Sequence, residues 1–138
     1  MTWIDERIRE RDERQRRSNL ILQQAEKVFA ALWDEIMNFI GEAMTKGFTL
    51  ATNGSPSERE IIRTLIPMPA GRSISNPAHL YVKVVREKGI ISATGPGVNI
   101  QFALHVRNDD VVCLTRDDKE LSVQAAAIAI LDPFLFPQ

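Results

Sequence analysis

The second half of the first 46 residues has the apolar pattern of a helix that packs on a broad surface. Apolar residues recur at intervals of three and four from Leu22 to Ala43. Four further apolar residues flank this stripe and widen it: Ile21, Val28, Trp33 and Ile40. Because such a wide stripe suits a sheet or a core better than a two-stranded coil alone, we expect this half of the helix to pack on a sheet.

The whole helix is expected to cover residues 3–46. Thr2 and Asp5 have the spacing of a capping box at its start, and Gly47 is a suitable stop. A helix of about 44 residues is roughly 66 Å long, since each residue adds about 1.5 Å. A compact domain of this size is only about 35–40 Å across. The pattern therefore leaves two alternatives: a break near Ser18–Asn19, or a charged end that projects from the domain.

The beginning of this helix is strongly charged. The segment from Asp5 to Arg17 contains five acids and six arginines around one apolar residue, Ile8. Four pairs have the favourable order with the acid four residues before the arginine: Asp5–Arg9, Glu10–Arg14, Asp12–Arg16 and Glu13–Arg17. Each pair contributes only roughly 0.2–0.5 kcal/mol, but together they could keep a solvated helix formed.

From Phe48 onward the pattern changes to the alternation of strands. Glycine, proline, asparagine and aspartate punctuate six short segments: Phe48–Asn53, Glu60–Ile66, His79–Arg86, Ile90–Thr94, Val98–Arg107 and Val111–Thr115. We predict an antiparallel meander of five or six strands, with a loop over Pro67–Pro77. The sequence does not fix the strand order.

The chain should close with a short helix. Ser122 can cap it, and Asp132–Pro133 should end it at about Leu131. The apolar tail Phe134–Phe136 either covers the sheet or reaches a neighbouring chain. The fold class is therefore α+β in a single domain, 1–138: a long helix over 1–46, an antiparallel sheet over 47–118, and the C-terminal helix with its tail over 119–138.

Composition excludes several classes of protein. The 138 residues are 44% hydrophobic and 25% charged, which is ordinary for one globular domain. A net charge of −1 makes nucleic acid an unlikely partner. The single cysteine, Cys113, suits a reducing compartment, and the pattern shows neither a signal peptide nor an apolar run of membrane-spanning length. We expect a cytoplasmic protein that does not enter a membrane.

One candidate site is the polar face of the predicted sheet. Alternation puts His79, Tyr81 and Lys83 on one side of their strand, opposite the apolar residues. Gln101, His105 and Arg107 do the same on the strand that begins at Val98. These six side chains could bind an anionic or polar ligand, with a histidine as a general base. The same alternation also occurs in any antiparallel sheet with one solvated face.

No other constellation indicates chemistry. His79, His105 and Cys113 lack the close spacing of metal ligands, so we expect no metal and no cofactor. Cys113 lies in an apolar strand segment, where a packing role is commoner than a nucleophilic one. No catalytic residue is assigned, and the sequence leans away from an enzyme.

The leading hypothesis is a small non-enzymatic binding or adaptor module that self-associates through its long helix. Trp3, Ile4 and Ile8 would form an adhesive end with little of its own chain to pack on. A homodimer with antiparallel helices is expected. In it, one charged stripe would meet the other across the two-fold axis, Glu6, Glu10 and Glu13 against Arg7, Arg11 and Arg14. The alternative is a small-molecule-binding domain, or a minor enzyme, that uses the polar sheet face; a separate protein partner is also possible.

Overall fold

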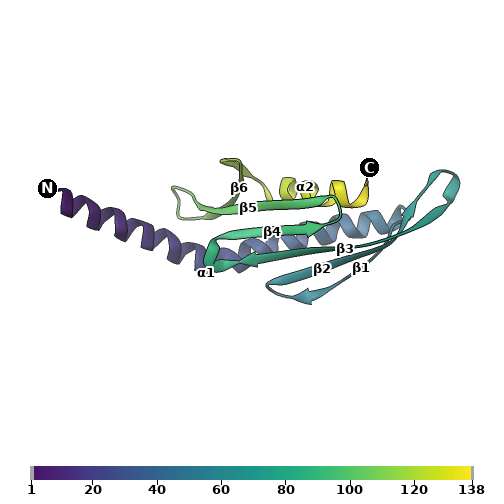
Figure 1. The fold of residues 1–138 in the computed structure, drawn as a ribbon, viewed down its shortest axis with the longest axis horizontal. Coiled ribbons are helices and arrows are strands. Elements are labelled where there is room, and N and C mark those ends of the chain that lie inside the picture. Colours follow the sequence, from purple (N-terminus) through teal and green to yellow (C-terminus); the bar gives the residue numbers. More distant parts are fainter. Residues whose placement is uncertain (1, 138) are drawn as a thin grey trace.

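The fold is a seven-stranded antiparallel sheet with two helices on one of its faces. A computed structural model describes residues 2–137 of the chain. Its elements are α1 (Trp3–Thr45), β1 (Thr49–Ser55), β2 (Glu58–Pro67), η1 (Pro69–Gly71), β3 (Ser73–Val85), η2 (Arg86–Lys88), β4 (Ile90–Gly95), β5 (Val98–Val106), β6 (Val112–Arg116), β7 (Lys119–Leu121) and α2 (Val123–Leu135). The strands are neighbours in chain order, β1 to β7, and each pair is antiparallel (Figure 1).

The predicted α+β class and meander are confirmed, but the strand count was too low. The missing strand is β7, which pairs with β6 through a two-residue turn at Asp117 and Asp118. Both residues have positive φ, as a tight hairpin turn of the primed type requires. Two consecutive aspartates are an unusual sequence for such a turn, so the pattern showed only a pair of acidic turn residues. The sheet therefore extends to Leu121 and not to residue 118.

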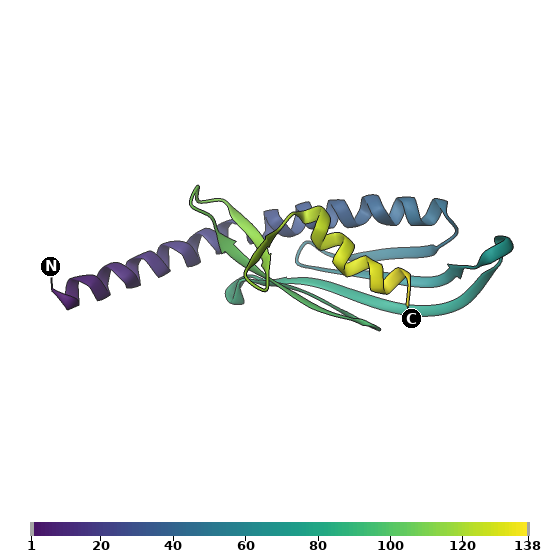
Figure 2. The same cartoon turned by 90° about the horizontal axis from the view of Figure 1, so that it is seen from above.

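Helix α1 is continuous, so the projecting end is the alternative that the fold adopts. The predicted capping box is present, because the side chain of Thr2 accepts from the backbone N–H of Asp5 and the Asp5 carboxylate accepts in return. Near the expected break, the side chain of Gln15 donates to Asn19 at 3.1 Å. In Figure 2, the N-terminal half of α1 extends well beyond the sheet, while its C-terminal half runs alongside the strands.

The charged stretch forms only part of the predicted ion pairs. Glu13–Arg17 is formed at 3.1 Å. Arg16, which the spacing assigned to Asp12, instead bonds Glu13 at 2.7 Å and Asp110 at 2.8 Å. Asp110 lies in the turn between β5 and β6, which is distant in sequence and could not enter a count of i,i+4 pairs. This contact is the first link between α1 and the sheet.

The core lies between the two helices and the inner face of the sheet. The residues of α1 that face it are spaced three and four apart, and Ala25, Phe29, Leu32 and Ile36 are at most 1% exposed. The sheet contributes the alternate residues of its central strands, Leu80, Val82, Ile91, Phe102 and Leu114, which are equally buried. This is the broad contact that the widened stripe of α1 predicted.

Helix α2 continues past the predicted stop. It extends to Leu135 with Pro133 inside it, and Ser122 caps its start as expected. Pro133 cannot donate a backbone hydrogen bond, but burial of Phe134 and Leu135 in the core offsets that loss. Phe136 packs edge-on against Phe48, with ring centroids 5.7 Å apart. The apolar tail therefore covers its own chain.

A buried arginine fixes the C-terminal end of α2 to the sheet. Arg63 on β2 is 2% exposed and donates to the backbone carbonyl of Phe134, while its guanidinium lies 4.9 Å from the Phe134 ring centroid. It also donates to the carbonyl and side-chain oxygens of Asn76, at 3.0 and 2.8 Å. Asn76 is free to accept because β3 bulges there, with Asn76 and Pro77 opposite Thr64. Burial lowers the pKa of Arg63, and the helix C-terminus supplies partial negative charge to its cation.

We expect Arg63→Ala to lower the free energy of unfolding by about 2–4 kcal/mol, because it leaves a cavity and buried carbonyls without donors. Urea denaturation followed by circular dichroism measures the loss. The matched control is Arg59→Ala, which removes a half-exposed arginine lying over Trp33 at 5.5 Å and should cost about 1 kcal/mol or less. Equal losses in the two variants would contradict a special role for Arg63.

Candidate functional site

The six polar residues predicted from alternation do lie on the outer face, the side of the sheet away from α1 and α2. Residues of β3 alternate between exposed His79, Tyr81 and Lys83 and buried Leu80 and Val82. The alternation in β5 is complete over all nine residues. Period-two patterning was therefore sufficient to assign the face.

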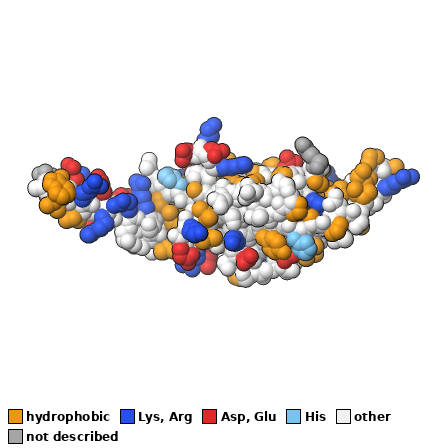
Figure 3. Space-filling model, in the orientation of Figure 1, with side chains coloured by type: hydrophobic (Ala, Val, Ile, Leu, Met, Phe, Trp, Pro, Cys, Tyr) orange, Lys and Arg blue, Asp and Glu red, His pale blue; other side chains and the backbone are white. Residues whose placement is uncertain are grey.

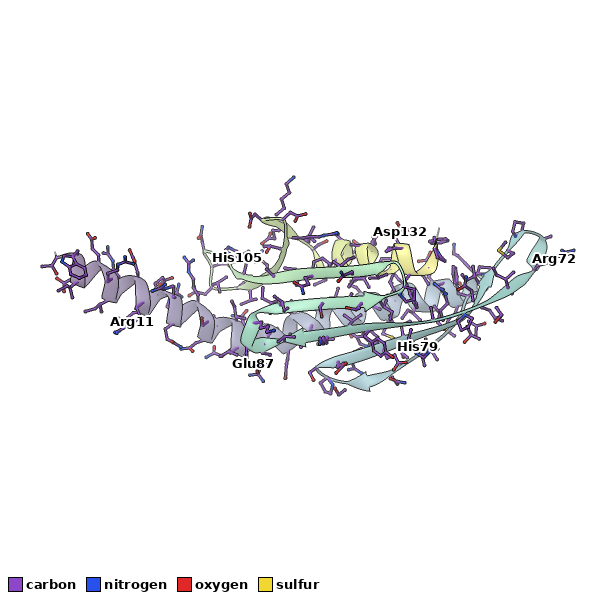
Figure 4. The ribbon with its side chains drawn as sticks, viewed as in Figure 1. Arg11, Arg72, His79, Glu87, His105 and Asp132 are labelled. Atoms are coloured by element: carbon purple, nitrogen blue, oxygen red, sulfur yellow. The ribbon has the colours of Figure 1, made fainter. Side chains whose placement is uncertain are left out.

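The sheet register nevertheless keeps the two histidines far apart. Lys83 pairs with Ser92 on β4, and Ser92 pairs with Gln101 on β5, so Lys83 and Gln101 lie at the same level. His79 lies four residues before this level and His105 four residues after it, which separates them by about 27 Å along the strands. Figure 4 shows them towards opposite ends of the sheet. His79 and Tyr81 thus belong to one group and His105 and Arg107 to another, with Lys83 and Gln101 at the level between them.

The first group is centred on His79. Its Nδ1 lies 2.6 Å from Oε1 of Glu60 on β2, and its ring stacks on Tyr81 with centroids 6.4 Å apart. Glu60 is directly opposite Tyr81 in the sheet register, so the three side chains form one cluster on the outer face. The carboxylate orients the imidazole, and Tyr81 offers an exposed ring. Sequence analysis did not find Glu60, because only the register brings it beside His79.

The second group lines a shallow hollow of about 830 Å³ at the β5–β7 end of the sheet. Its walls are formed by His105, Arg107, Asn108, Asp109, Thr115, Asp118 and Glu120. Only His105 and Arg107 among these were predicted as site residues. Asn108 and Asp109 follow Arg107 directly in the chain, whereas the hairpin between β6 and β7, which the sequence pattern did not reveal, brings in Asp118 and Glu120.

Charge in this hollow is negative. Arg107 is already engaged, since it lies 3.2 Å from Asp109 and 3.6 Å from Glu120. These two carboxylates raise the pKa of Arg107, and the backbone N–H of Val111 lowers the pKa of Asp109. With Asp118, three carboxylates face one arginine and one histidine. The hollow thus favours a cationic ligand over the anionic one that the isolated residues suggested.

Cys113 is directly opposite His105 in the register between β5 and β6. Burial is the main cause that raises the pKa of its thiol to about 11, and a hydrogen bond with Glu120 adds to the effect. The thiol is therefore protonated near neutral pH, which makes it a poor nucleophile and a poor metal ligand. Over residues 2–137, no group of three or more histidine, cysteine, aspartate or glutamate side chains is arranged to hold a metal ion.

The second candidate region is the N-terminal part of α1, residues 3–15, which we call the arm. Its apolar side chains are strongly exposed: 72% for Trp3, 52% for Ile4 and 44% for Ile8. Figure 3 shows hydrophobic atoms gathered at this free end of the molecule, next to charged ones. Arg7 and Arg11 are exposed too, and their ion pairs with Glu10 (3.6 Å) and Asp12 (3.4 Å) stay within the arm.

Comparison with known proteins finds no matching family model, no matching curated protein and no matching solved structure. In the part of the chain that the structure describes, no helix is long and apolar enough to cross a membrane.

The raised pKa of Cys113 predicts slow alkylation and a defined pH dependence. At pH 8 its thiolate fraction should be about a hundredfold lower than that of a cysteine with the ordinary pKa, so iodoacetamide should react slowly with the folded protein and normally in urea. Because the folded state holds this proton more tightly than the unfolded state, stability should fall as the pH rises from 9.0 toward about 11. Cys113→Ser is the control for the pH effect, and equal alkylation rates in buffer and in urea would contradict the assignment.

Proposed function

We propose that this protein is a small non-enzymatic binding or adaptor module that self-associates through its arm. The observation that carries the proposal is the exposure of Trp3, Ile4 and Ile8 on the part of α1 that no other described element covers. The arm begins before the first link of α1 to the sheet, which is made by Arg16. It spans 13 residues and is therefore about 20 Å long.

The free-energy cost of leaving apolar side chains in water favours a partner for this arm. The arm extends a helix that the packed half of α1 already nucleates, and its own ion pairs add only about 0.2–0.5 kcal/mol each. Burying exposed tryptophan and isoleucine side chains against a second surface lowers the free energy, because it removes apolar surface from water. A second copy of the chain supplies such a surface, and two-fold symmetric dimers are the commonest assemblies. Arg7 and Arg14 flank the apolar side chains and would border the contact, whereas Arg11 lies on the same stripe as Ile4 and Ile8.

A catalytic reading has weaker support. The two histidines lie far apart on the outer face, Arg107 is engaged by carboxylates, and the Cys113 thiol is protonated near neutral pH. The reducing compartment that one unpaired cysteine suits leads us to place the protein in the cytoplasm.

The alternative is a small-molecule-binding domain or a minor enzyme that uses the hollow at the β5–β7 end. The observation in its favour is the acidic lining, with Asp109, Asp118 and Glu120 around about 830 Å³. It would take a small organic cation such as a polyamine. Binding of spermidine that is lost in Glu120→Gln, measured by calorimetry at low salt, would support this function.

Self-association through the arm predicts a dimer that depends on its apolar residues. At tens of micromolar, sedimentation velocity should give a mass about twice 15.6 kDa. The triple variant Trp3→Ala, Ile4→Ala, Ile8→Ala should give a folded monomer, because these residues touch nothing in the core.

Ile128→Ala is the matched control, since this exposed residue lies on α2 and away from the arm. The Ile128→Ala variant should dimerise with the same dissociation constant as the wild-type protein. A monomeric wild-type protein, or a triple variant that still dimerises, would contradict the proposal.

A further inference from the structure

Two of the three exposed apolar residues of the arm, Ile4 and Ile8, lie on one seam of α1, whereas Trp3 occupies position c, off this seam. Ile4 and Ile8 are four residues apart, and Leu22 follows Ile8 by two heptads, so all three occupy positions a or d of a single heptad repeat. Their side chains are 52%, 44% and 37% exposed. Between them, the same seam carries Arg11, Gln15 and Ser18. This is a short seam, with its apolar layers at the free end of the arm.

The charges on the two flanks of this seam have opposite sign. Arg7 and Arg14 occupy position g, on one flank, and Asp5 and Asp12 occupy position e, on the other. The stripe of Glu6, Glu10 and Glu13 lies at positions c and f, which face away from the seam. These glutamates cannot meet the arginines of a second copy across a shared seam, so the antiparallel pairing expected from the sequence loses its electrostatic basis.

Symmetry then decides the orientation of two arms. When the two-fold axis is parallel to the helices, the g flank of one copy meets the e flank of the other. When the axis is perpendicular, as in an antiparallel pair, each flank meets the same flank of the second copy. Parallel arms therefore place arginine against aspartate, whereas antiparallel arms place arginine against arginine and aspartate against aspartate.

We infer that two copies of this chain join through parallel arms, with Arg7 of each copy beside Asp12 of the other. The inference rests on the proposed self-association and adds its geometry. In a parallel pair, position g contacts position e of the following heptad, and residue 12 stands five positions after residue 7. The contact occurs twice, once on each side of the seam. The two sheets then lie at the same end of the pair.

The structure leaves these groups available. Arg7 and Asp12 are 73% and 66% exposed and hold only intrahelical contacts of 3.6 and 3.4 Å, which are weak and easily exchanged in water. Asp5, the other aspartate on the e flank, is engaged in the capping box with Thr2. Arg16, which ties α1 to the sheet, occupies position b, away from the seam. The seam of the arm is therefore open to a second helix.

Charge reversal tests the orientation, with the dimer dissociation constant measured by sedimentation equilibrium at low salt. For parallel arms, Arg7→Glu or Asp12→Arg alone replaces two attractions by two repulsions and should weaken the dimer about five- to tenfold. The double variant Arg7→Glu, Asp12→Arg restores both attractions and should recover wild-type affinity. Arg9→Glu is the matched control at outward-facing position b and should change affinity by less than about twofold. High salt should reduce all these differences, and circular dichroism verifies the helix in each variant.

The outcomes separate the orientation from the self-association itself. A wild-type dimer that Arg7→Glu tightens would overturn the parallel arrangement and support antiparallel arms, because a repulsive arginine contact would have been removed. A dimer indifferent to Arg7→Glu, as to Arg9→Glu, would overturn the arm as the interface. A wild-type monomer at all concentrations would overturn the proposed function and the inference with it.

Discussion

The burial of Phe29, Leu32 and Ile36 against the inner face of the sheet is the interaction on which the rest of the structure depends. A meander of seven strands presents one apolar face, and that face is unstable in water unless a helix covers it. The second half of α1 provides this cover, and α2 completes it. Only once this layer is formed can Arg63 lose its hydration shell and bond the C-terminal end of α2. Burial of Arg63 thus depends on the core, and its hydrogen bond to Phe134 in turn holds α2 against the sheet.

The same constraint divides α1 into a packed half and an exposed half. The sheet is shorter than the helix, so the apolar stripe has a surface to cover only from about Leu20 onward. Before that point the helix carries alternating charge and a few exposed apolar residues, and its contacts with the sheet begin at Arg16. A helix that continues beyond its own domain keeps its heptad geometry, and this geometry places arginine and aspartate on opposite sides of Ile4 and Ile8. The rigid attachment of the second half would therefore present the arm in a fixed direction.

The outer face illustrates how an antiparallel sheet distributes polar residues without necessarily forming a site. Alternation puts His79, Lys83 and His105 on the same side of the sheet. The register between neighbouring strands, however, places each of them at a different level along the strands. His79 finds Glu60 and Tyr81, whereas His105 lies with the acids of β6 and β7. The hollow at that end gains its negative charge from residues that no single strand contains. Its character follows from the hairpin at Asp117–Asp118, which brings Glu120 back beside Arg107.

Local pattern determined the helix over 3–46 to within one residue at its end, the meander, the N-caps of both helices and the sheet face that carries the six predicted polar residues. These features depend on spacings within one element, where 3.6- and two-residue periods act directly. Tertiary structure alone decided the seventh strand, the continuation of α2 through Pro133, the partner of Arg16 and the separation of the two histidines. Each of these depends on contacts between segments distant in sequence, whose free energy outweighs local preference: burial of Phe134 offsets a proline, and Asp110 draws Arg16 away from Asp12. The sequence by itself thus specified which side chains share a face of a helix or strand, and only the packed sheet decided which of these side chains are exposed and which lie together.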